Sequence, residues 1–296
     1  MDEYILSCCS TADMSREQLE ERGIAHLCFH YALNGREMPD DLGQTLPFPA
    51  FYQAMRDGAD TATSMPSMGE YIDYFTPFLQ AGKDVLHVSL SSGLSGAYNA
   101  ATLAAETLRE RFPERKLLVV DSLGASSGYG LLMDHLAELR DEGMDIDTLY
   151  AWAEENRLRL HHWFFSTDLS FYVRGGRISR ASGFFGGLMG ICPLLNMDDA
   201  GRLVPREKIR SKARVMQAMV DRMEACADGG RDYSGKCFLS HSDCYEDARA
   251  VADMVEARFP KLRGRVCIHY VGTTIGSHTG HGTVALFFWG RDRGEA

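Results

Sequence analysis

Short apolar runs alternate along the chain with longer segments in which apolar residues recur at helical spacing. The short runs predict β-strands over Tyr4–Cys8, Ala25–Tyr31, Asp84–Leu90, Lys116–Val120, His161–Phe165, Pro193–Met197, Lys236–Ser240, Arg265–Tyr270 and Thr283–Trp289. Several of them are almost continuously apolar, as strands are when helices cover both faces of their sheet. The alternation predicts an α/β fold.

Helical segments are expected between these strands. Ser67 and Glu70 have the spacing of a capping box, which predicts a helix running toward Ala81. Further helices are predicted over Tyr98–Arg111, Ser211–Ala227 and Cys244–Phe259.

The second half of the chain carries a turn signal and follows a candidate boundary. Residues 198–201, Asp-Asp-Ala-Gly, predict a hairpin turn between the Pro193–Met197 strand and Leu203–Val204. A charged helical segment ends near Asn156, just before the next predicted strand. We therefore expect two α/β domains, residues 1–157 and 158–296.

Composition is that of an ordinary globular protein. The 296 residues are 45% apolar and 24% charged, which allows a large core. The net charge of −10 argues against a general nucleic-acid binder, whose affinity would come from a basic surface. We expect no nucleic-acid partner.

Sequence features also predict a compartment. The N-terminus lacks the basic start and apolar run of a signal peptide. No apolar stretch approaches the roughly 18–20 residues that span a bilayer. The eight cysteines are scattered without a CxxC pair, as expected for reduced thiols. We expect a cytoplasmic protein without stable membrane insertion, limited to transient membrane contact.

Small polar residues and glycines gather in four segments where strands should end, which is where α/β folds bind ligands. In the first, Thr63 and Ser64 precede a helix start that can hold an anionic oxygen. In the second, Ser91, Ser92 and Ser95 lie between a buried strand and a helix. This loop matches neither GxGxxG nor a P-loop, so it predicts no nucleotide site.

The third and fourth segments add an arginine and a histidine. Arg177 follows two glycines, and its planar fork suits a carboxylate or a phosphate. His278 lies in a Gly/Ser/Thr-rich segment, residues 276–282, which we expect to form a loop. His278 and His281 lack the i, i+4 spacing of helical metal ligands, and no carboxylate cluster accompanies them, so no metal site is predicted. Phe184 and Phe185 fit either an apolar channel wall or tight helix packing.

Taken in order, these segments resemble the DegV family, whose characterised members bind fatty acids. The resemblance covers nearly the whole chain. Its motifs are Ser10-Thr11-Ala12-Asp13, Thr63-Ser64-x-Pro66-Ser67, Ser91-Ser92-x-Leu94-Ser95-Gly96-x-Tyr98-Asn99, Val120-Asp121-Ser122, Leu169-x-x-Tyr172-x-x-Gly175-Gly176-Arg177-Ile178 and His278-x-Gly280-x-Gly282.

The resemblance implies two α/β domains with a buried acyl tunnel and a carboxylate site at the domain interface. Thr63 and Ser92 would hold the carboxylate, with His278 close by. Arg177 and, by a weaker match, Arg210 would act at the head-group end when the acyl group is phosphorylated. Family members serve bacterial phospholipid metabolism as the binding subunit of fatty acid kinase. A separate ATP-binding subunit makes the acyl-phosphate, so the chain would be a lipid carrier rather than an enzyme. No cofactor is implied besides the bound fatty acid.

The chain departs from the family pattern at three positions. Cys9 stands where Asp is usual, Cys192 where Lys is usual, and His281 where Pro is usual. The first two changes remove charges.

The free energies of burying an acyl chain and its head group are consistent with a lipid carrier. An acyl chain gains roughly 0.8 kcal/mol per buried methylene, and its ionised head group needs hydrogen bonds when buried. Short Thr and Ser donors, with a histidine able to add charge, meet that need.

Two alternative functions remain open. One is a serine hydrolase of acyl esters or acyl-phosphates that uses the Ser91–Ser95 loop and His278. The other is a carrier of another anionic small molecule, held by Arg177 and the serine loop.

Overall fold

The computed structural model describes residues 4–179 and 191–294. In its first half, four parallel strands form a sheet in the order β2-β1-β6-β7. These strands are β1 Ile5–Cys9, β2 Ile24–Leu27, β6 Val85–Ser89 and β7 Leu117–Asp121. The helices of this half are α1 Arg16–Glu21, α2 Phe48–Arg56, α3 Met68–Gln80, α4 Ala97–Arg111, α5 Ser126–Asp141 and α6 Ile146–Asn156.

Alternating side chains of this sheet enter two different cores. Leu6 and Val88 pack on one face with residues of α1, α5 and α6. Cys9 and Val85 pack on the other face against α3 and α4. The sheet is therefore covered on both sides, which explains its nearly continuous apolar strands.

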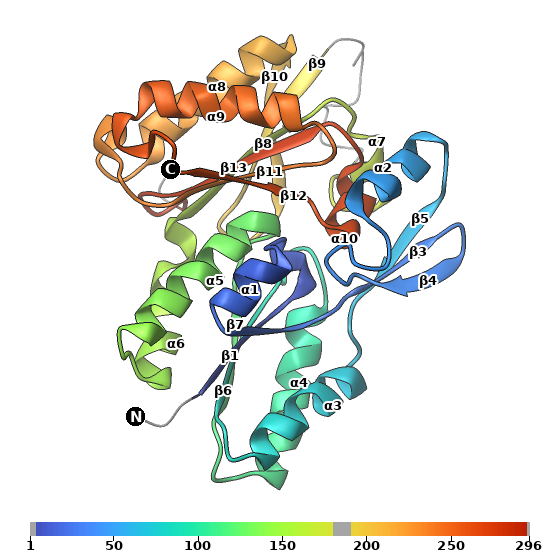
Figure 1. The fold of residues 1–296 in the computed structure, drawn as a ribbon, viewed down its shortest axis with the longest axis vertical. Helices are drawn as coiled ribbons and strands as arrows, with labels where there is room; N and C mark the ends of the chain where they lie inside the picture. The colour runs from blue at the N-terminus through green and yellow to red at the C-terminus, as the bar shows by residue number, and fades with distance from the viewer. Residues whose placement is uncertain (1–3, 180–190, 295–296) are drawn as a thin grey trace.

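The second half contains a mixed six-stranded sheet in the order β10-β9-β8-β13-β11-β12. Its strands are β8 Leu160–Ser166, β9 Ile191–Met197, β10 Leu203–Arg210, β11 Cys237–His241, β12 Val266–Tyr270 and β13 Thr283–Trp289. One face packs against α8 Lys212–Cys226 and α9 Tyr245–Arg258. The opposite face lies against α5 (Figure 1). It contributes Phe164 and Phe287 to the core that contains this helix. The two halves thus share a core around α5.

A small antiparallel sheet lies beside this junction. Its order is β4-β3-β5, with β3 His30–Leu33, β4 Arg36–Pro39 and β5 Thr61–Ser64. It packs against α10 Thr273–Thr279 from the far end of the chain, which also contacts α7 Ser170–Arg174 (Figure 1). Residues distant in sequence therefore meet here. Short 3-10 helices complete the description at Ser10–Ala12, Arg157–Arg159, Gly230–Asp232 and Pro260–Leu262.

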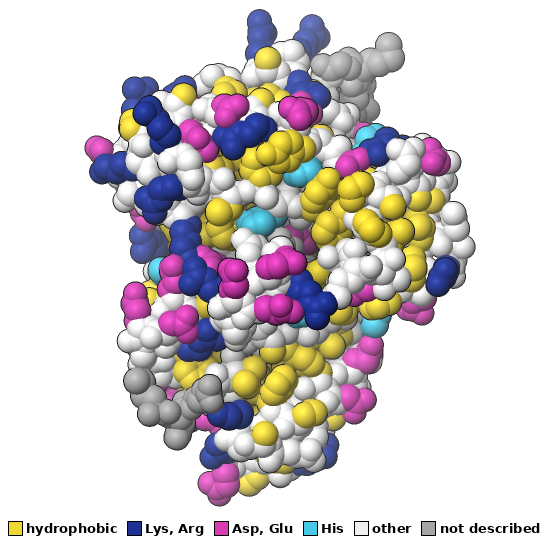
Figure 2. Space-filling view, in the orientation of Figure 1, with side chains coloured by type: hydrophobic (Ala, Val, Ile, Leu, Met, Phe, Trp, Pro, Cys, Tyr) yellow, Lys and Arg dark blue, Asp and Glu magenta, His cyan; other side chains and the backbone are white. Residues whose placement is uncertain are grey.

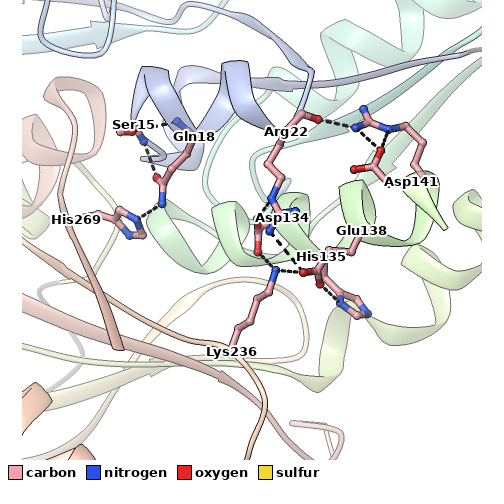
Figure 3. Close-up of polar contacts among 10 residues, drawn as sticks. Ser15, Gln18, Arg22, Asp134, His135, Glu138, Asp141, Lys236 and His269 are labelled. Atoms are coloured by element: carbon pink, nitrogen blue, oxygen red, sulfur yellow. Dashed lines mark hydrogen bonds and ion pairs between the residues drawn. The ribbon is translucent and has the colours of Figure 1, made fainter. Parts of the chain in front are cut away.

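Charged and polar side chains also pack where the two halves meet. Arg22 Nε donates to Asp134 Oδ1 at 2.6 Å, linking α1 to α5. Lys236, which directly precedes β11, pairs with Asp134 and with Glu138 Oε1 at 2.6 Å (Figure 3). Gln18 Nε2 lies 2.9 Å from Nε2 of His269 on β12. Acidic and basic side chains intermingle on the surface of this junction (Figure 2).

The α/β fold class is confirmed. Each predicted strand except Ala25–Tyr31 overlaps one observed strand, and the four predicted helices and the 198–201 hairpin turn are present. Ser67 and Glu70 form the capping box. The Ala25–Tyr31 prediction was wrong, because the chain leaves the first sheet after Leu27 and enters the small sheet at His30. The boundary near residues 156–160 lies between α6 and β8 and stays a prediction.

Candidate ligand-binding site

A cavity of about 490 Å³ lies where the sheets and α10 meet, within the roughly 300–1,000 Å³ usual for ligand pockets. Most of its wall is apolar. Residues of both halves contribute to that wall, among them Phe29, Leu90, Phe164, Met197, Ala285 and Phe287. Met65 also lines the cavity and is 40% exposed, so the cavity reaches the surface beside β5.

Thr63 and His278 meet at this open end. Thr63 lies in β5, His278 lies in the last turn of α10, and Thr63 Oγ1 is 2.7 Å from His278 Nε2. Both residues line the cavity. The expectation that residues 276–282 form a loop was wrong for its first part, which belongs to α10. Because glycine is unfavourable in helices, Gly276 and Gly280 led to the prediction of a loop in place of this short helix.

Buried carboxylates hold the start of α10. Asp13 Oδ1 accepts from the Gly272 amide at 3.0 Å, and Asp40 Oδ1 accepts from Thr273 Oγ1 at 2.7 Å. Burial raises the pKa of Asp13 well above its usual value, although the hydrogen bond from Ser126 opposes this. The Ser10–Asp13 motif therefore positions the helix that carries His278.

The absence of a side chain at Gly175 leaves room for the His278 ring. A Cβ at Gly175 would stand 2.3 Å from His278 Nδ1. Two residues later, the half-buried Arg177 lines the cavity, and its Nη2 donates to Leu94 O at 3.3 Å. Gly175 thus lets the His278 ring pack close to the backbone of the segment that carries Arg177.

Electrostatics keep His278 neutral near pH 7. Burial, aided by the positive charges of Arg177 and Arg174, lowers the pKa of His278 to about 4. In the ligand-free protein, burial and the two neighbouring arginines disfavour the positive charge that the sequence analysis allowed for this histidine. The polar contact of His278 is its hydrogen bond with Thr63 Oγ1.

Of the three serines in the Ser91–Ser95 loop, one lines the cavity and two do not. Ser95 lines the cavity, and its Oγ accepts from the Ala97 amide at 3.2 Å. Ser92 is exposed, lies outside the lining, and its amide donates to Asp121 Oδ1 at 3.1 Å. Ser91 is buried outside the lining and donates to Gly201 O at 2.8 Å. The structure therefore brings Ser95, rather than Ser91 or Ser92, to the cavity.

The remaining predicted site residues are spread out. Ser64 lines the cavity, while its Oγ donates to Glu37 Oε1 at 3.3 Å. Arg210 is exposed at the end of β10 and lies outside the lining, so the structure does not bring it to the cavity. Phe184 and Phe185 lie outside the described residues.

The three departures from the family pattern lie in different settings. Cys9 is buried, and its Sγ is 3.3 Å from the Tyr71 hydroxyl; burial raises the pKa of this thiol to about 12. Cys192 is half-buried on β9, opposite Ile209. His281 packs edge-on against Phe171. None of the three lines the cavity.

Several polar residues of the lining were missed by the sequence analysis, Ser126, Ser240 and Thr274 among them. Ser126 follows β7 with φ of +54°, and Ser240 lies within an apolar strand. Thr274 lies in the first turn of α10. Ser126 and Ser240 come from elements far apart in the sequence, so no spacing within the chain marks them.

A hydrolytic Ser–His pair finds little support in this geometry. His278 Nε2 has a threonine, not a serine, at 2.7 Å. Among the described residues, no group of three His, Cys, Asp or Glu side chains could hold a metal ion. In the same residues, no helix is long and apolar enough to cross a membrane.

The chain is thus an α/β protein with an apolar, surface-connected cavity where its sheets meet, in the size range of ligand pockets. Residues 9–291 match the family model described as "Uncharacterised protein, DegV family". The chain belongs to the DegV family. It is 32% identical over 290 residues to the DegV domain-containing protein CPE0026 of Clostridium perfringens, covering 98% of each chain. It is also 31% identical over 279 residues to YteA of Lactococcus lactis, covering 94% of each.

Solved structures share the fold. A fatty-acid-binding DegV family protein from Thermus thermophilus superposes with a TM-score of 0.86 at 26% identity, covering 97% of this chain and 99% of the other. The Fak B3 protein of Streptococcus pneumoniae fatty acid kinase, loaded with linoleic acid, gives a TM-score of 0.82 at 19% identity. This superposition covers 98% of this chain and 99% of the pneumococcal one. The predicted DegV fold is thereby confirmed.

Proposed function

We propose that this protein binds a long-chain fatty acid in the cavity, with the carboxylate at the open end beside Thr63, Ser95 and His278. The observation that carries the proposal is one surface-connected cavity whose mostly apolar wall also contains Ser95 and the hydrogen-bonded pair Thr63 and His278. Each buried methylene of the ligand contributes roughly 0.8 kcal/mol, which favours a long chain. The Thermus relative, which is described as binding fatty acid, supports the same ligand class.

Hydrogen bonds at the mouth suit a carboxylate. Thr63 Oγ1 lies 2.7 Å from Nε2 of neutral His278. The proposal uses the tautomer in which Nε2–H donates to Thr63 Oγ1, so that the Thr63 proton points at the ligand. Ser95 supplies a second hydroxyl donor. Charge-assisted bonds of this kind are about twice as strong as neutral ones. Arg177 lies close enough to balance the negative charge.

The protein then presents this carboxylate to a separate, ATP-binding kinase subunit. A carboxylate oxygen attacks the γ-phosphorus of the partner's ATP, ADP leaves, and the acyl-phosphate remains on the carrier. Support comes from the resemblance of the Arg177 segment to the family and from the fold shared with Fak B3. Arg177 is half-buried at the mouth, where its fork can meet added phosphate oxygens. In this account the chain carries lipid and leaves catalysis to its partner.

Two variants separate binding from presentation. Thr63→Ala is expected to weaken binding of hexadecanoate, measured by calorimetry. Arg177→Ala is expected to reduce acyl-phosphate formation with the ATP-binding subunit of a bacterial fatty acid kinase more than it reduces binding. Equal losses in both assays would make Arg177 a primary carboxylate contact. Failure of the wild-type protein to bind any long-chain fatty acid would contradict the proposal.

A further inference from the structure

A methionine lines the open end of the cavity. Met65 directly follows β5, is part of the lining and is 40% exposed. Met68, in the first turn of α3, is 36% exposed and lies outside the lining. Among the described residues, these two are the most exposed methionines. A peroxide in solution therefore reaches these two side chains more readily than the buried methionines.

The Met65 thioether lies beside a serine that we assign to the carboxylate. Ser95 Oγ donates a hydrogen bond to Met65 Sδ at 3.8 Å. Gly96 makes room for this contact, because a Cβ at Gly96 would stand 3.1 Å from both Sδ and Cε of Met65. Ser95 Oγ also accepts from the Ala97 amide at 3.2 Å, and its single proton is the one directed at the sulfur. The Met65 sulfur and a bound carboxylate thus compete for the same donor.

Oxidation of the sulfur would change this competition. A thioether is a weak acceptor, so a carboxylate oxygen readily takes the Ser95 hydrogen bond from it. A sulfoxide is polar, and its oxygen accepts hydrogen bonds while the group has no donor. At Met65 such an oxygen would occupy the Ser95 hydroxyl and place a second electron-rich oxygen beside the ligand carboxylate. Both changes weaken the binding of an anionic ligand.

We propose that Met65 is an oxidative modification site that controls ligand binding, with hydrogen peroxide as the oxidant. The sulfur lone pair attacks one peroxide oxygen, the O–O bond breaks, and the sulfoxide forms as the other oxygen leaves as water. A methionine sulfoxide reductase restores the thioether, while two thiols are oxidised to a disulfide and water is released. This inference rests on the proposed function, since it takes the carboxylate position as given. It goes further by making ligand binding respond to peroxide.

Peroxide treatment followed by calorimetry tests the inference. After treatment, dithiothreitol reverses cysteine sulfenic acids and disulfides, and peptide mass spectrometry measures the sulfoxide at Met65 and at Met68. Once Met65 is converted, hexadecanoate is expected to bind about tenfold more weakly, the loss that one hydrogen bond to a charged group supports. Methionine sulfoxide reductases A and B are expected to restore the affinity. Circular dichroism checks that the treated protein is folded.

Three variants assign the effect, each compared with its own untreated sample. In Met65→Leu, treatment is expected to change the affinity less than about twofold, because this side chain has no sulfur to oxidise. Met68→Leu is the matched control, because it removes a thioether of similar exposure from outside the lining and should keep the loss of about tenfold. In Ser95→Ala, the hydroxyl that the sulfoxide would occupy is absent, so treatment is expected to weaken binding less than in the wild-type protein.

The outcomes are distinguishable. Full hexadecanoate affinity in wild-type protein whose Met65 is a sulfoxide would overturn this inference while leaving fatty-acid binding intact. A loss that persists in Met65→Leu, or a Met65 thioether that resists peroxide when Met68 is converted, would overturn it as well. Equal losses in Ser95→Ala and the wild-type protein would overturn its basis in a shared donor. Failure of the untreated protein to bind any long-chain fatty acid would contradict the proposed function together with this inference.

Discussion

Two polar regions join the halves of this molecule, and they differ in how their groups are satisfied. Around Asp134, the charges of Arg22, Lys236 and Glu138 are paired with one another (Figure 3). At the cavity, the polar groups are hydroxyls and a neutral histidine set in an apolar wall. Among the described residues, Thr274 Oγ1 and His278 Nδ1 have no hydrogen-bond partner.

This difference distinguishes a structural junction from a binding site. Paired charges have little left to offer a ligand, so the Asp134 network contributes to holding α1, α5 and β11 together. Hydroxyls bonded only to neutral groups beside an apolar cavity gain free energy when a ligand carboxylate accepts their hydrogen bonds. Substitutions in the two regions should therefore change different measured quantities.

The largest effect is expected from filling the cavity. Ala285 lines it and is 7% exposed, so Ala285→Trp places an indole where acyl methylenes would lie. Displacing about four methylenes weakens binding of hexadecanoate by about 200-fold at 0.8 kcal/mol each. Calorimetry measures the loss, and circular dichroism checks folding. Ala125→Leu, from the first half of the chain, is a second cavity-filling variant. Full affinity in both folded variants would place the ligand elsewhere.

Asp134→Asn should act on stability alone. The Asp134 side chain is 9% exposed and pairs with Arg22, which is 33% exposed. Removing its charge leaves cations partly buried, and with their exposure considered the free energy of unfolding falls by about 2 kcal/mol. Urea denaturation measures this change. Hexadecanoate affinity should stay within about twofold.

Asp141→Asn is the control for that substitution. Asp141 is 55% exposed in its pair with Arg140, so the expected change is below about 0.5 kcal/mol. Similar losses for the two variants would show that the Asp134 network is no more stabilising than a surface pair.

At the mouth, Thr63→Ala and Ser95→Ala should each weaken hexadecanoate binding about tenfold, as expected for a hydrogen bond to a charged group. Thermal unfolding of the ligand-free variants should stay close to that of the wild-type protein. Ser92→Ala sharpens the comparison, because Ser92 is exposed outside the lining and little change is expected. If Ser92→Ala lowered hexadecanoate affinity as much as Ser95→Ala, Ser92 would also contribute to carboxylate binding.

The smallest expected change concerns pH. Burial lowers the pKa of His278 to about 4, whereas an unfolded histidine titrates near 6.5. The unfolded chain binds the proton first, so this residue's contribution to stability is present above about pH 6.5 and is lost as the pH falls toward 4. In His278→Gln, ligand-free protein should take up at most about one proton fewer on unfolding in this window. Identical pH dependences of urea denaturation would contradict the buried, neutral assignment.

Much of the fold follows from local pattern, and the exceptions have physical causes. Strands covered on both faces, such as Val85–Ser89, are nearly continuous apolar runs and are easily recognised. The small sheet was missed because its strands are short and half exposed, as in Thr61–Ser64. Helix α10 was missed because Gly276 and Gly280 resemble loop glycines, whereas Gly276 allows close packing against the Tyr52 ring.

The site was only partly predictable. Thr63, Ser95, Arg177 and His278 were recognised as candidates because they lie in polar segments at the ends of elements. Sequence alone could not choose among the three serines of one loop, because side-chain direction depends on how the loop docks on Gly201. Thr274 was missed because its place in the lining depends on a cavity wall assembled from both halves of the chain.

The most direct test of the central claim is mass spectrometry of small molecules released by denaturing the purified protein. The account predicts a near-stoichiometric long-chain fatty acid in the wild-type extract and a clear reduction in the extract of Ala285→Trp. A folded wild-type protein that releases no fatty acid, and takes up none when it is supplied, would contradict the account.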